Sequence, residues 1–138
     1  MFKKYLNEIT PSNIIFTSLY DDCYGGDFNG DGNATTPDKG AWKYIHLDGY
    51  NNTSQGIGNM NYCKLLYAGF NTGAVYFRRS DRGYFTNGLL QYSAYRDLRA
   101  EYDTLTTTNN SFPDCYDLGV YAQGAVLELD NCDFNFLI

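Results

Sequence analysis

An acidic, glycine-rich stretch, GGDFNGDGNATTPDKGAW at residues 25–42, holds the residues of this chain that are best suited to chemistry. Its carboxylate and amide side chains recur at alternate positions, and a glycine follows the third of them. A hard cation such as calcium takes about six to eight oxygen ligands, and alternate residues of a tight loop can direct oxygens to one point. We therefore expect a calcium site with these ligands: Asp27, Asn29, Asp31, Asn33 (through its backbone carbonyl) and Asp38.

The ligand spacing overlaps the twelve-residue loop of EF-hands and dockerins. Ala34 stands where those loops usually carry a branched apolar residue, and the AWKYIHLDG that follows is strand-like. These features favour a calcium-bound turn over a helix–loop–helix, with Asp21 and Asp22 as additional ligands. A turn that binds nothing is the alternative, because Asp and Gly also stabilise metal-free turns. In the calcium interpretation the ion has a structural role and catalyses nothing.

A second group of residues offers a weaker case for catalysis. Asp81 and Asp103 are 22 residues apart, and Arg79 lies beside the first of them. On neighbouring strands of one sheet two such carboxylates would be about 5 Å apart and could act as acid and base. A solvated turn that pairs with nearby arginines is the more ordinary interpretation. We expect no catalytic site, with Asp81, Asp103 and Arg79 as the alternative.

Tyrosine is unusually abundant, with 14 residues. Its flat apolar face and polar tip suit sugar stacking and protein contacts, although tyrosines also pack between neighbouring strands. The candidates for an exposed binding face are Tyr92, Tyr95, Tyr102, Tyr116 and Tyr121.

A period of 22 residues organises the elements that must position these side chains. Asn87, Asn109 and Asn131 recur at this interval. Other positions repeat with them: Leu90 with Phe112 and Phe134, Leu105 with Leu127, Leu98 with Val120, and, at a spacing of 25, Leu65 with Leu90. Short strands at such a period predict a solenoid in which each repeat forms one coil. Loop asparagines that cluster by chance are the alternative.

In a solenoid, residues of one column stack on each other. Leucine and phenylalanine columns would form a continuous apolar core. An asparagine column would form a ladder of amides that satisfies buried turn backbone. Cys63 and Cys132 fall in one column several coils apart, so we expect free thiols rather than a disulfide between them. The four cysteines and the single histidine lack zinc-ligand spacing.

With these columns set, the chain resembles the right-handed parallel β-helix proteins that are common among secreted and surface-attached bacterial proteins. The matching segments are a strand that ends in FTS, a DD-x-x-GGD turn, the NGDG loop, a Trp-led strand, and the coil strands MNYCKLLYAG and LELDNCDFNF. The chain departs from the pattern at Asp27-Phe28-Asn29 and at Trp42-Lys43-Tyr44-Ile45. The resemblance implies an all-β fold and leaves function open, because that architecture serves lyases, hydrolases, adhesins and spacers.

The resulting organisation is an N-terminal helical cap at residues 1–12 and a short β-helix at 13–138. It has about five coils and a loop insertion at residues 20–41. The net charge of −6 excludes a nucleic-acid partner, and no apolar run is long enough to span a membrane. We expect a self-associating structural or adhesive module, a homo-oligomer or fibre, outside the cell or at its surface, although no signal peptide is visible. A carbohydrate-active enzyme or glycan-binding domain is the alternative.

Overall fold

A computed structural model of the chain describes residues 2–6, 14–49 and 56–136, which form fourteen strands and no helix. The strands make three sheets, named A, B and C here. Sheet A contains β1 (Phe2–Leu6), β2 (Ile14–Ser18), β5 (Cys63–Leu66), β8 (Leu89–Gln91), β11 (Ser111–Cys115) and β14 (Asp133–Phe136). Sheet B contains β3 (Ile45–Asp48), β6 (Gly73–Arg78), β9 (Arg96–Glu101) and β12 (Leu118–Gln123). Sheet C contains β4 (Ile57–Asn61), β7 (Arg82–Thr86), β10 (Thr104–Thr108) and β13 (Val126–Asp130).

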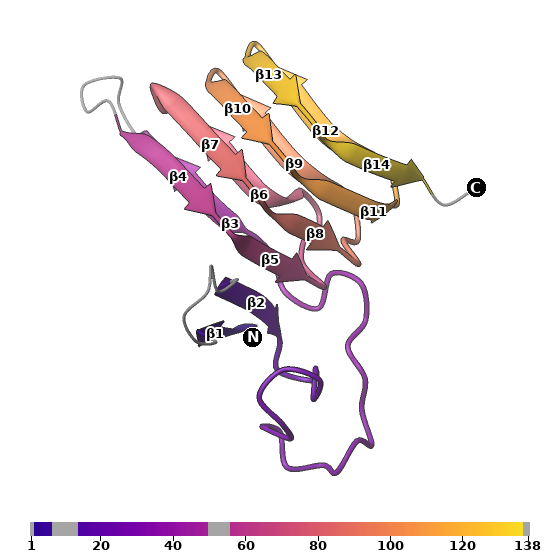
Figure 1. The fold of residues 1–138 in the computed structure, drawn as a ribbon. Helices are drawn as coiled ribbons and strands as arrows, with labels where there is room; N and C mark the ends of the chain where they lie inside the picture. Colours follow the sequence, from indigo (N-terminus) through magenta and orange to yellow (C-terminus); the bar gives the residue numbers. More distant parts are fainter. Residues whose placement is uncertain (1, 7–13, 50–55, 137–138) are drawn as a thin grey trace.

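The chain visits the sheets in the order A, B, C and then returns to A, so each coil adds one strand to each sheet. Paired strands are parallel, apart from β1 and β2. Figure 1 shows the coils stacked along one axis, with β4, β7, β10 and β13 side by side. The fold is a parallel β-helix, as the sequence period predicted.

The number of coils is smaller than expected. Three complete turns separate β4 from β13 in sheet C, and the same holds for β3 and β12 in sheet B. The first coil runs from Ile14 to Asn61 and is about twice as long as those that follow. The estimate of about five coils was wrong because it gave the first coil an ordinary length.

Each coil turns from sheet C back to sheet A at one residue in the left-handed region. Asn87, Asn109 and Asn131 occupy this corner with φ angles of 52°, 55° and 47°. Asparagine tolerates positive φ better than most residues, because its short side chain can bond to nearby groups. Asn109 Nδ2 donates to Asn87 Oδ1 at 3.1 Å, and Asn131 Nδ2 donates to Asn109 Oδ1 at 2.7 Å. The amide ladder is present, and Asn87 extends it to Asn61 at 2.9 Å.

The asparagine ladder was expected to satisfy buried backbone groups at the turn, but a neighbouring residue has this role. Asn109 and Asn131 are exposed, so their amides bond to each other on the outer surface. Asn110 is buried instead: its Nδ2 donates to the carbonyl of Phe85 at 2.7 Å, and its Oδ1 accepts from the N–H of Gly88 at 2.7 Å. It is therefore Asn110 that satisfies buried backbone where the chain turns.

The predicted apolar columns form the core. Leu65, Leu90 and Phe112 are fully enclosed, and Phe134 stacks on Phe112 with ring centroids 4.6 Å apart. The register also pairs Leu105 with Leu127 and Leu98 with Val120. Burial of each such side chain stabilises the fold by roughly 1.5–3 kcal/mol relative to exposure.

The prediction of a helical cap is wrong for residues 2–6, the part of the cap that the structure describes. Phe2–Leu6 forms β1, which pairs with β2 in antiparallel register from Phe2↔Ser18 to Leu6↔Ile14. A segment this short is a poor isolated helix, whereas the edge of β2 offers a row of unpaired N–H and C=O groups. The remainder of the expected cap, residue 1 and residues 7–12, lies outside the described residues.

All four cysteines are free thiols, as predicted for Cys63 and Cys132. The described ranges contain no helical segment suited to crossing a membrane.

Candidate functional site

The acidic stretch lies in residues 19–44, which connect β2 to β3 without forming a strand. The insertion expected at 20–41 falls within this connection. Figure 1 shows that the connection extends away from the stacked coils and then returns to them. Its two parts have different roles: an acidic loop (residues 21–35) and a strap (residues 39–42) that runs along the solenoid.

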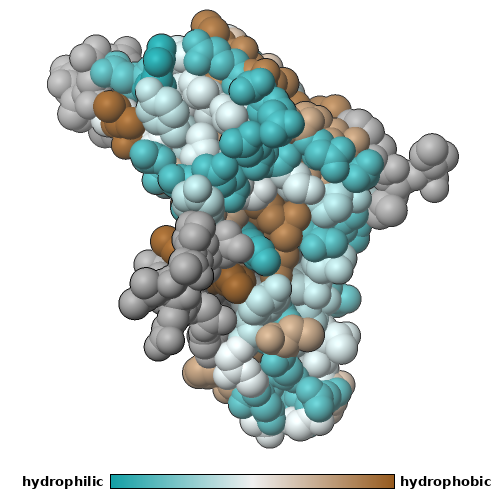
Figure 2. All heavy atoms as spheres, viewed as in Figure 1, coloured by the Kyte–Doolittle hydropathy of each residue, from teal (hydrophilic) through white to brown (hydrophobic). Residues whose placement is uncertain are grey.

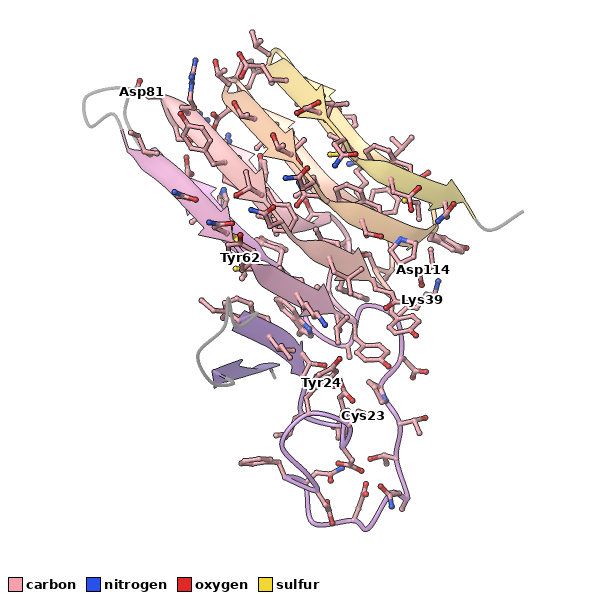
Figure 3. All side chains as sticks on the ribbon, viewed as in Figure 1. Cys23, Tyr24, Lys39, Tyr62, Asp81 and Asp114 are labelled. Atoms are coloured by element: carbon pink, nitrogen blue, oxygen red, sulfur yellow. The ribbon has the colours of Figure 1, made fainter. Side chains whose placement is uncertain are left out.

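The strap contacts three successive coils. Trp42 is buried, and its Nε1 donates to the carbonyl of Leu66 at 2.8 Å. Gly40 packs so closely that a Cβ at this position would lie 2.5 Å from Cβ of Ala94. Lys39 Nζ lies 3.3 Å from Asp114 Oδ2, and Figure 3 shows these two side chains meeting beside the later coils.

Three carboxylates converge in the acidic loop. One oxygen from each of Asp22, Asp27 and Asp31 lies within 4.8 Å of the others. Two ligands of one calcium ion can be about 5 Å apart, because each lies roughly 2.3–2.6 Å from the metal. The spacing of this carboxylate cluster therefore fits a single calcium ion.

Backbone N–H groups and a hydroxyl hold two of the three carboxylates. Asp27 accepts from the N–H of Asp31 at 3.0 Å and of Gly32 at 2.8 Å. Asp31 accepts from the N–H of Ala34 at 3.0 Å and from the hydroxyl of Thr35. The Thr35 hydroxyl has the largest effect on the pKa of Asp31, which is lowered although partial burial opposes it. The Asp31 carboxylate is therefore favoured in its charged form, and the two N–H groups hold the carboxylate of Asp27 in place.

Two oxygens in the loop lack partners. Asp22 Oδ1 and Asn29 Oδ1 are buried atoms without a hydrogen-bond donor among the described residues. The amide nitrogen of Asn29 donates to Asp31 Oδ2 at 2.8 Å, so its oxygen is near the cluster. Buried oxygens without donors are costly, and a cation would satisfy them. The donor set of carboxylate and amide oxygens therefore suits calcium.

The structure brings some of the predicted ligands together and separates others. Asp27, Asn29 and Asp31 lie together, and Asp22 joins them although the sequence made it only an additional ligand. Asn33 is exposed with φ of 74° and lines a cleft that Asp22 also lines. Asp38 is exposed and outside the carboxylate cluster; its carbonyl accepts from the N–H of Ala41 at 3.1 Å.

Asp21, an additional ligand in the sequence prediction, has a structural role. Its carboxylate accepts from the hydroxyl of Thr17 and from the N–H of Cys23 at 3.2 Å, and the residue is buried. These bonds fix the turn that begins the acidic loop.

The catalytic candidates occupy unlike environments. Asp81 is exposed, and Figure 3 shows it far from the acidic loop. Asp103 is only 6% exposed and accepts from the N–H of Ser80 at 3.2 Å and from its hydroxyl. Arg79 forms a corner with φ of 52°, and its N–H donates to the carbonyl of Glu101 at 3.0 Å. Asp103 and Arg79 thus have evident roles in shaping the coil.

Sequence reasoning missed a column of flat groups on the outer face of sheet B. This stacked column comprises His46, Tyr76, Arg99 and Tyr121, which the strand register places in line. The His46 and Tyr76 rings are stacked 4.5 Å apart, and Arg99 Cζ lies 4.6 Å from the Tyr76 centroid. The 22-residue spacing of Arg99 and Tyr121 was the available signal.

Glu101 fixes the middle of this column. It accepts from the hydroxyl of Tyr76 and from Nε of Arg99 at 2.9 Å. Burial works against its charge, but these bonds outweigh that effect and lower the pKa of Glu101. Burial and the bond to Glu101 raise the pKa of Tyr76 to about 12. For His46, partial burial lowers the pKa, although Asp48 opposes the shift.

The exposed tyrosines are fewer than predicted. Tyr95, Tyr102 and Tyr116 are 37%, 58% and 69% exposed, but Tyr92 stacks on Tyr67 with ring centroids 4.7 Å apart. Tyr121 packs against Arg96, whose Cζ lies 4.0 Å from the ring centroid. These contacts between coils leave three of the five tyrosines exposed.

The interior also contains a carboxylate that the sequence did not reveal. Asp97 is 2% exposed, and the thiol of Cys115 donates to its Oδ2 at 3.1 Å. Burial raises the pKa of Asp97 to about 6 and that of Cys115 to about 12. The thiol therefore stays protonated at neutral pH and is a poor nucleophile.

Comparisons of the chain with models of protein families, with curated protein sequences and with solved structures find no significant match. The resemblance drawn from the sequence motifs is thus supported at the level of architecture, a parallel β-solenoid. Function has to be argued from the surfaces of this molecule.

Proposed function

We propose that this protein is an extracellular structural or adhesive β-helix module that calcium stabilises and that associates with further copies of itself through the end of its solenoid. The motif resemblance to secreted and surface-attached bacterial β-helix proteins with an acidic loop supports this assignment. The last coil carries the argument.

That coil exposes apolar side chains. Leu118, Val126 and Leu129 are 40%, 59% and 50% exposed, and Figure 2 shows hydrophobic atoms along this edge of the molecule. Leu127 and Phe134, which continue core columns, are only partly buried. In the described residues no strand pairs with the outer edges of β12, β13 and β14. Unpaired edges beside exposed apolar residues favour association by strand pairing.

The opposite end is less open. In sheet A, β1 covers the edge of β2, so only β3 and β4 present free edges there among the described residues. If the last coils of two molecules associate with each other, the three free strand edges of one molecule meet the three free strand edges of the other. We therefore expect the last coil to be the main contact.

Calcium would act through the loop. Bound between Asp22, Asp27 and Asp31, with Asn29 as a further ligand, it would neutralise three carboxylates and hold the acidic loop closed. The strap is part of the same connection and lies against three coils, so loop closure would stabilise the solenoid. Calcium is abundant outside cells, which is the reason for including this location in the proposal.

The decisive experiment compares charge substitutions at the two ends. The double variant Val126→Lys/Leu129→Lys places two lysines on the last coil, and Ile57→Lys places a single lysine on β4, where Ile57 is 68% exposed. We expect light scattering to show a concentration-dependent size for the unchanged chain and for Ile57→Lys, and a monomer for the double variant. Exposed carboxylates flank the last coil, so association should strengthen with added salt.

Other outcomes are equally informative. Loss of association in both variants would indicate head-to-tail stacking into fibres rather than contact between last coils. A monomer at every concentration and salt level would contradict the proposal.

A further inference from the structure

The chain contains two Asn–Gly pairs, Asn29–Gly30 in the acidic loop and Asn87–Gly88 in the turn between β7 and β8. Such a pair can modify itself, because glycine has no side chain to keep its backbone nitrogen away from the side-chain carbonyl carbon of the asparagine. The two pairs are chemically identical but have opposite surroundings in the structure. Any difference in their reactivity in the folded chain is therefore set by the fold.

Hydrogen bonds and packing hold the Asn87–Gly88 pair. The amide of Asn87 bonds along the ladder in both directions, through its nitrogen at 2.9 Å and its oxygen at 3.1 Å. The N–H of Gly88 donates to Asn110 Oδ1 at 2.7 Å. A Cβ at Gly88 would lie 2.5 Å from Cζ of the Phe85 ring, so the glycine also packs against the core. Reaction at this pair requires the corner to open.

The Asn29–Gly30 pair lacks these restraints. The N–H of Gly30 makes no hydrogen bond among the described residues, and only its chain neighbours lie within 4 Å of the place that a Cβ would occupy. Asn29 Nδ2 donates to Asp31 at 2.8 Å and to Thr35 at 2.9 Å, which both belong to the acidic loop. Figure 1 shows this loop outside the stack of coils. Reaction at this pair therefore breaks no hydrogen bond to a coil.

We propose that Asn29 is a site of spontaneous deamidation, and that the fold protects Asn87 from the same reaction. The nitrogen of Gly30 attacks Cγ of Asn29 and gives its proton to solvent. The bond between Cγ and Nδ2 then breaks, and the side-chain nitrogen leaves as ammonia. Water opens the resulting five-membered succinimide at one of its two carbonyl carbons, which gives either aspartate or isoaspartate at position 29.

The two products would change the calcium site in opposite ways, a consequence that rests on the proposed function, whereas the deamidation itself does not. Aspartate would add a fourth carboxylate to those of Asp22, Asp27 and Asp31, and ligand charge raises calcium affinity. Isoaspartate would add a methylene to the main chain between Asp27 and Asp31 and so misplace the ligands. Since succinimides open mainly to isoaspartate, deamidation would act as an irreversible timer that weakens the site.

The test follows the masses of the two tryptic peptides that carry Asn29 and Asn87, while the full chain is kept folded in chelator at mildly alkaline pH. Added salt screens the carboxylates of Asp27 and Asp31, which oppose loss of the Gly30 proton. We expect Asn29 to deamidate roughly ten times faster than Asn87, or more, as a hydrogen bond that must first break would require. Asn29→Gln should remain unmodified, because the larger ring closes far more slowly.

The chain unfolded in urea is the matched control. Both pairs are then equally free, so Asn29 and Asn87 should deamidate at similar rates. Equal rates in the folded chain, or a faster reaction at Asn87, would overturn the proposal. A difference that persists unchanged in urea would also overturn it, because the fold would not be its cause.

A calcium titration separates this inference from the proposed function. The aged chain, rich in isoaspartate, should lose the stabilisation by calcium that the fresh chain shows, and Asn29→Asp should keep it. If calcium stabilises neither the fresh nor the aged chain, the metal site and the timer are rejected and the deamidation stands. An aged chain that keeps the full response to calcium would reject the timer alone.

Discussion

At the scale of the residue, asparagine shows how one side chain can serve both the backbone and the surface. Asn109 adopts a φ of 55°, and its amide bonds to the amides of the coils before and after it. Glycine would accept the same φ, and alanine would not. The free-energy cost of positive φ at this corner and the stabilisation by the amide ladder can therefore be measured separately.

We predict that Asn109→Gly lowers the free energy of unfolding by about 1–2 kcal/mol, the worth of two exposed amide bonds. Asn109→Ala should lose about 1–2 kcal/mol more, because it adds left-handed strain. Urea denaturation of the three proteins measures both differences. Equal stability of the two variants would show that the corner does not require positive φ.

Asp97 makes the stability of the fold depend on pH. The sign of this dependence is opposite to that of a surface carboxylate in an ion pair. The pKa of Asp97 is about 6 in the folded protein against 3.8 in the unfolded chain, because burial disfavours the charged form. Between these values the folded protein binds more protons than the unfolded chain. The stabilising contribution of protonated Asp97 is therefore complete below about pH 4 and is lost as the pH rises through about 6.

We predict that Asp97→Asn removes this dependence. The shift of about two pH units corresponds to roughly 3 kcal/mol, so the unchanged chain should lose up to this much relative to Asp97→Asn between about pH 4 and pH 7. The measurement is urea denaturation across that range. A stability difference between the two proteins that does not change with pH would contradict the assignment.

At the scale of the element, the connection between β2 and β3 does more than join two strands. Its acidic loop gathers three carboxylates, and its strap places Trp42 and Lys39 against different coils. Without a cation the carboxylates repel each other, and with one they become ligands. The effect of a charge-removing substitution should therefore change sign with calcium.

We predict that calcium at a hundred times its dissociation constant stabilises the chain by about 2.7 kcal/mol, and that a chelator reverses this. Asp22→Asn should abolish most of the gain, yet be equal to or slightly more stable than the unchanged chain in chelator. Asp81→Asn is the control and should respond to calcium normally. Thermal denaturation with calcium, magnesium or chelator measures these differences.

The affinity from the same titration bears on location. A dissociation constant of about 10⁻⁴–10⁻³ M is typical of extracellular calcium modules. Identical unfolding curves with calcium and with chelator would reject the metal site.

At the scale of the whole molecule, the two ends of the solenoid are managed differently. One end has β1 lying across the edge of sheet A, whereas the last coil leaves the described edges of all three sheets unpaired. Antiparallel pairing of β1 blocks a further parallel strand at that place. A chain with β1 in place should therefore resist head-to-tail stacking.

We predict that removal of residues 1–6 frees the edge of β2 and converts limited association into open-ended growth. Light scattering should show a larger mean size at equal concentration, and electron microscopy should show elongated particles. The same truncation in Val126→Lys/Leu129→Lys is the control and should stay small. An unchanged size distribution after truncation would show that β1 does not limit assembly.

The sequence by itself determined the coiled architecture, because a residue and its partner one turn later are separated by a nearly constant number of residues. Contacts that follow this period could be predicted, namely the amide ladder through Asn109 and the Leu90–Phe112 column. The same period predicted that Cys63 and Cys132 lie several coils apart and form no disulfide. The acidic loop could be predicted in part, since Asp27 and Asp31 are close in sequence.

Only the tertiary structure decided the contacts that cross the period. The Lys39–Asp114 pair depends on how a long connection folds back along the axis, and the His46–Tyr76 stack follows a first coil of unusual length. Likewise Asp97 lies in the interior, where the thiol of Cys115 from the next coil donates to it. Insertion length and side-chain direction set these distances, and neither is encoded in a repeating pattern.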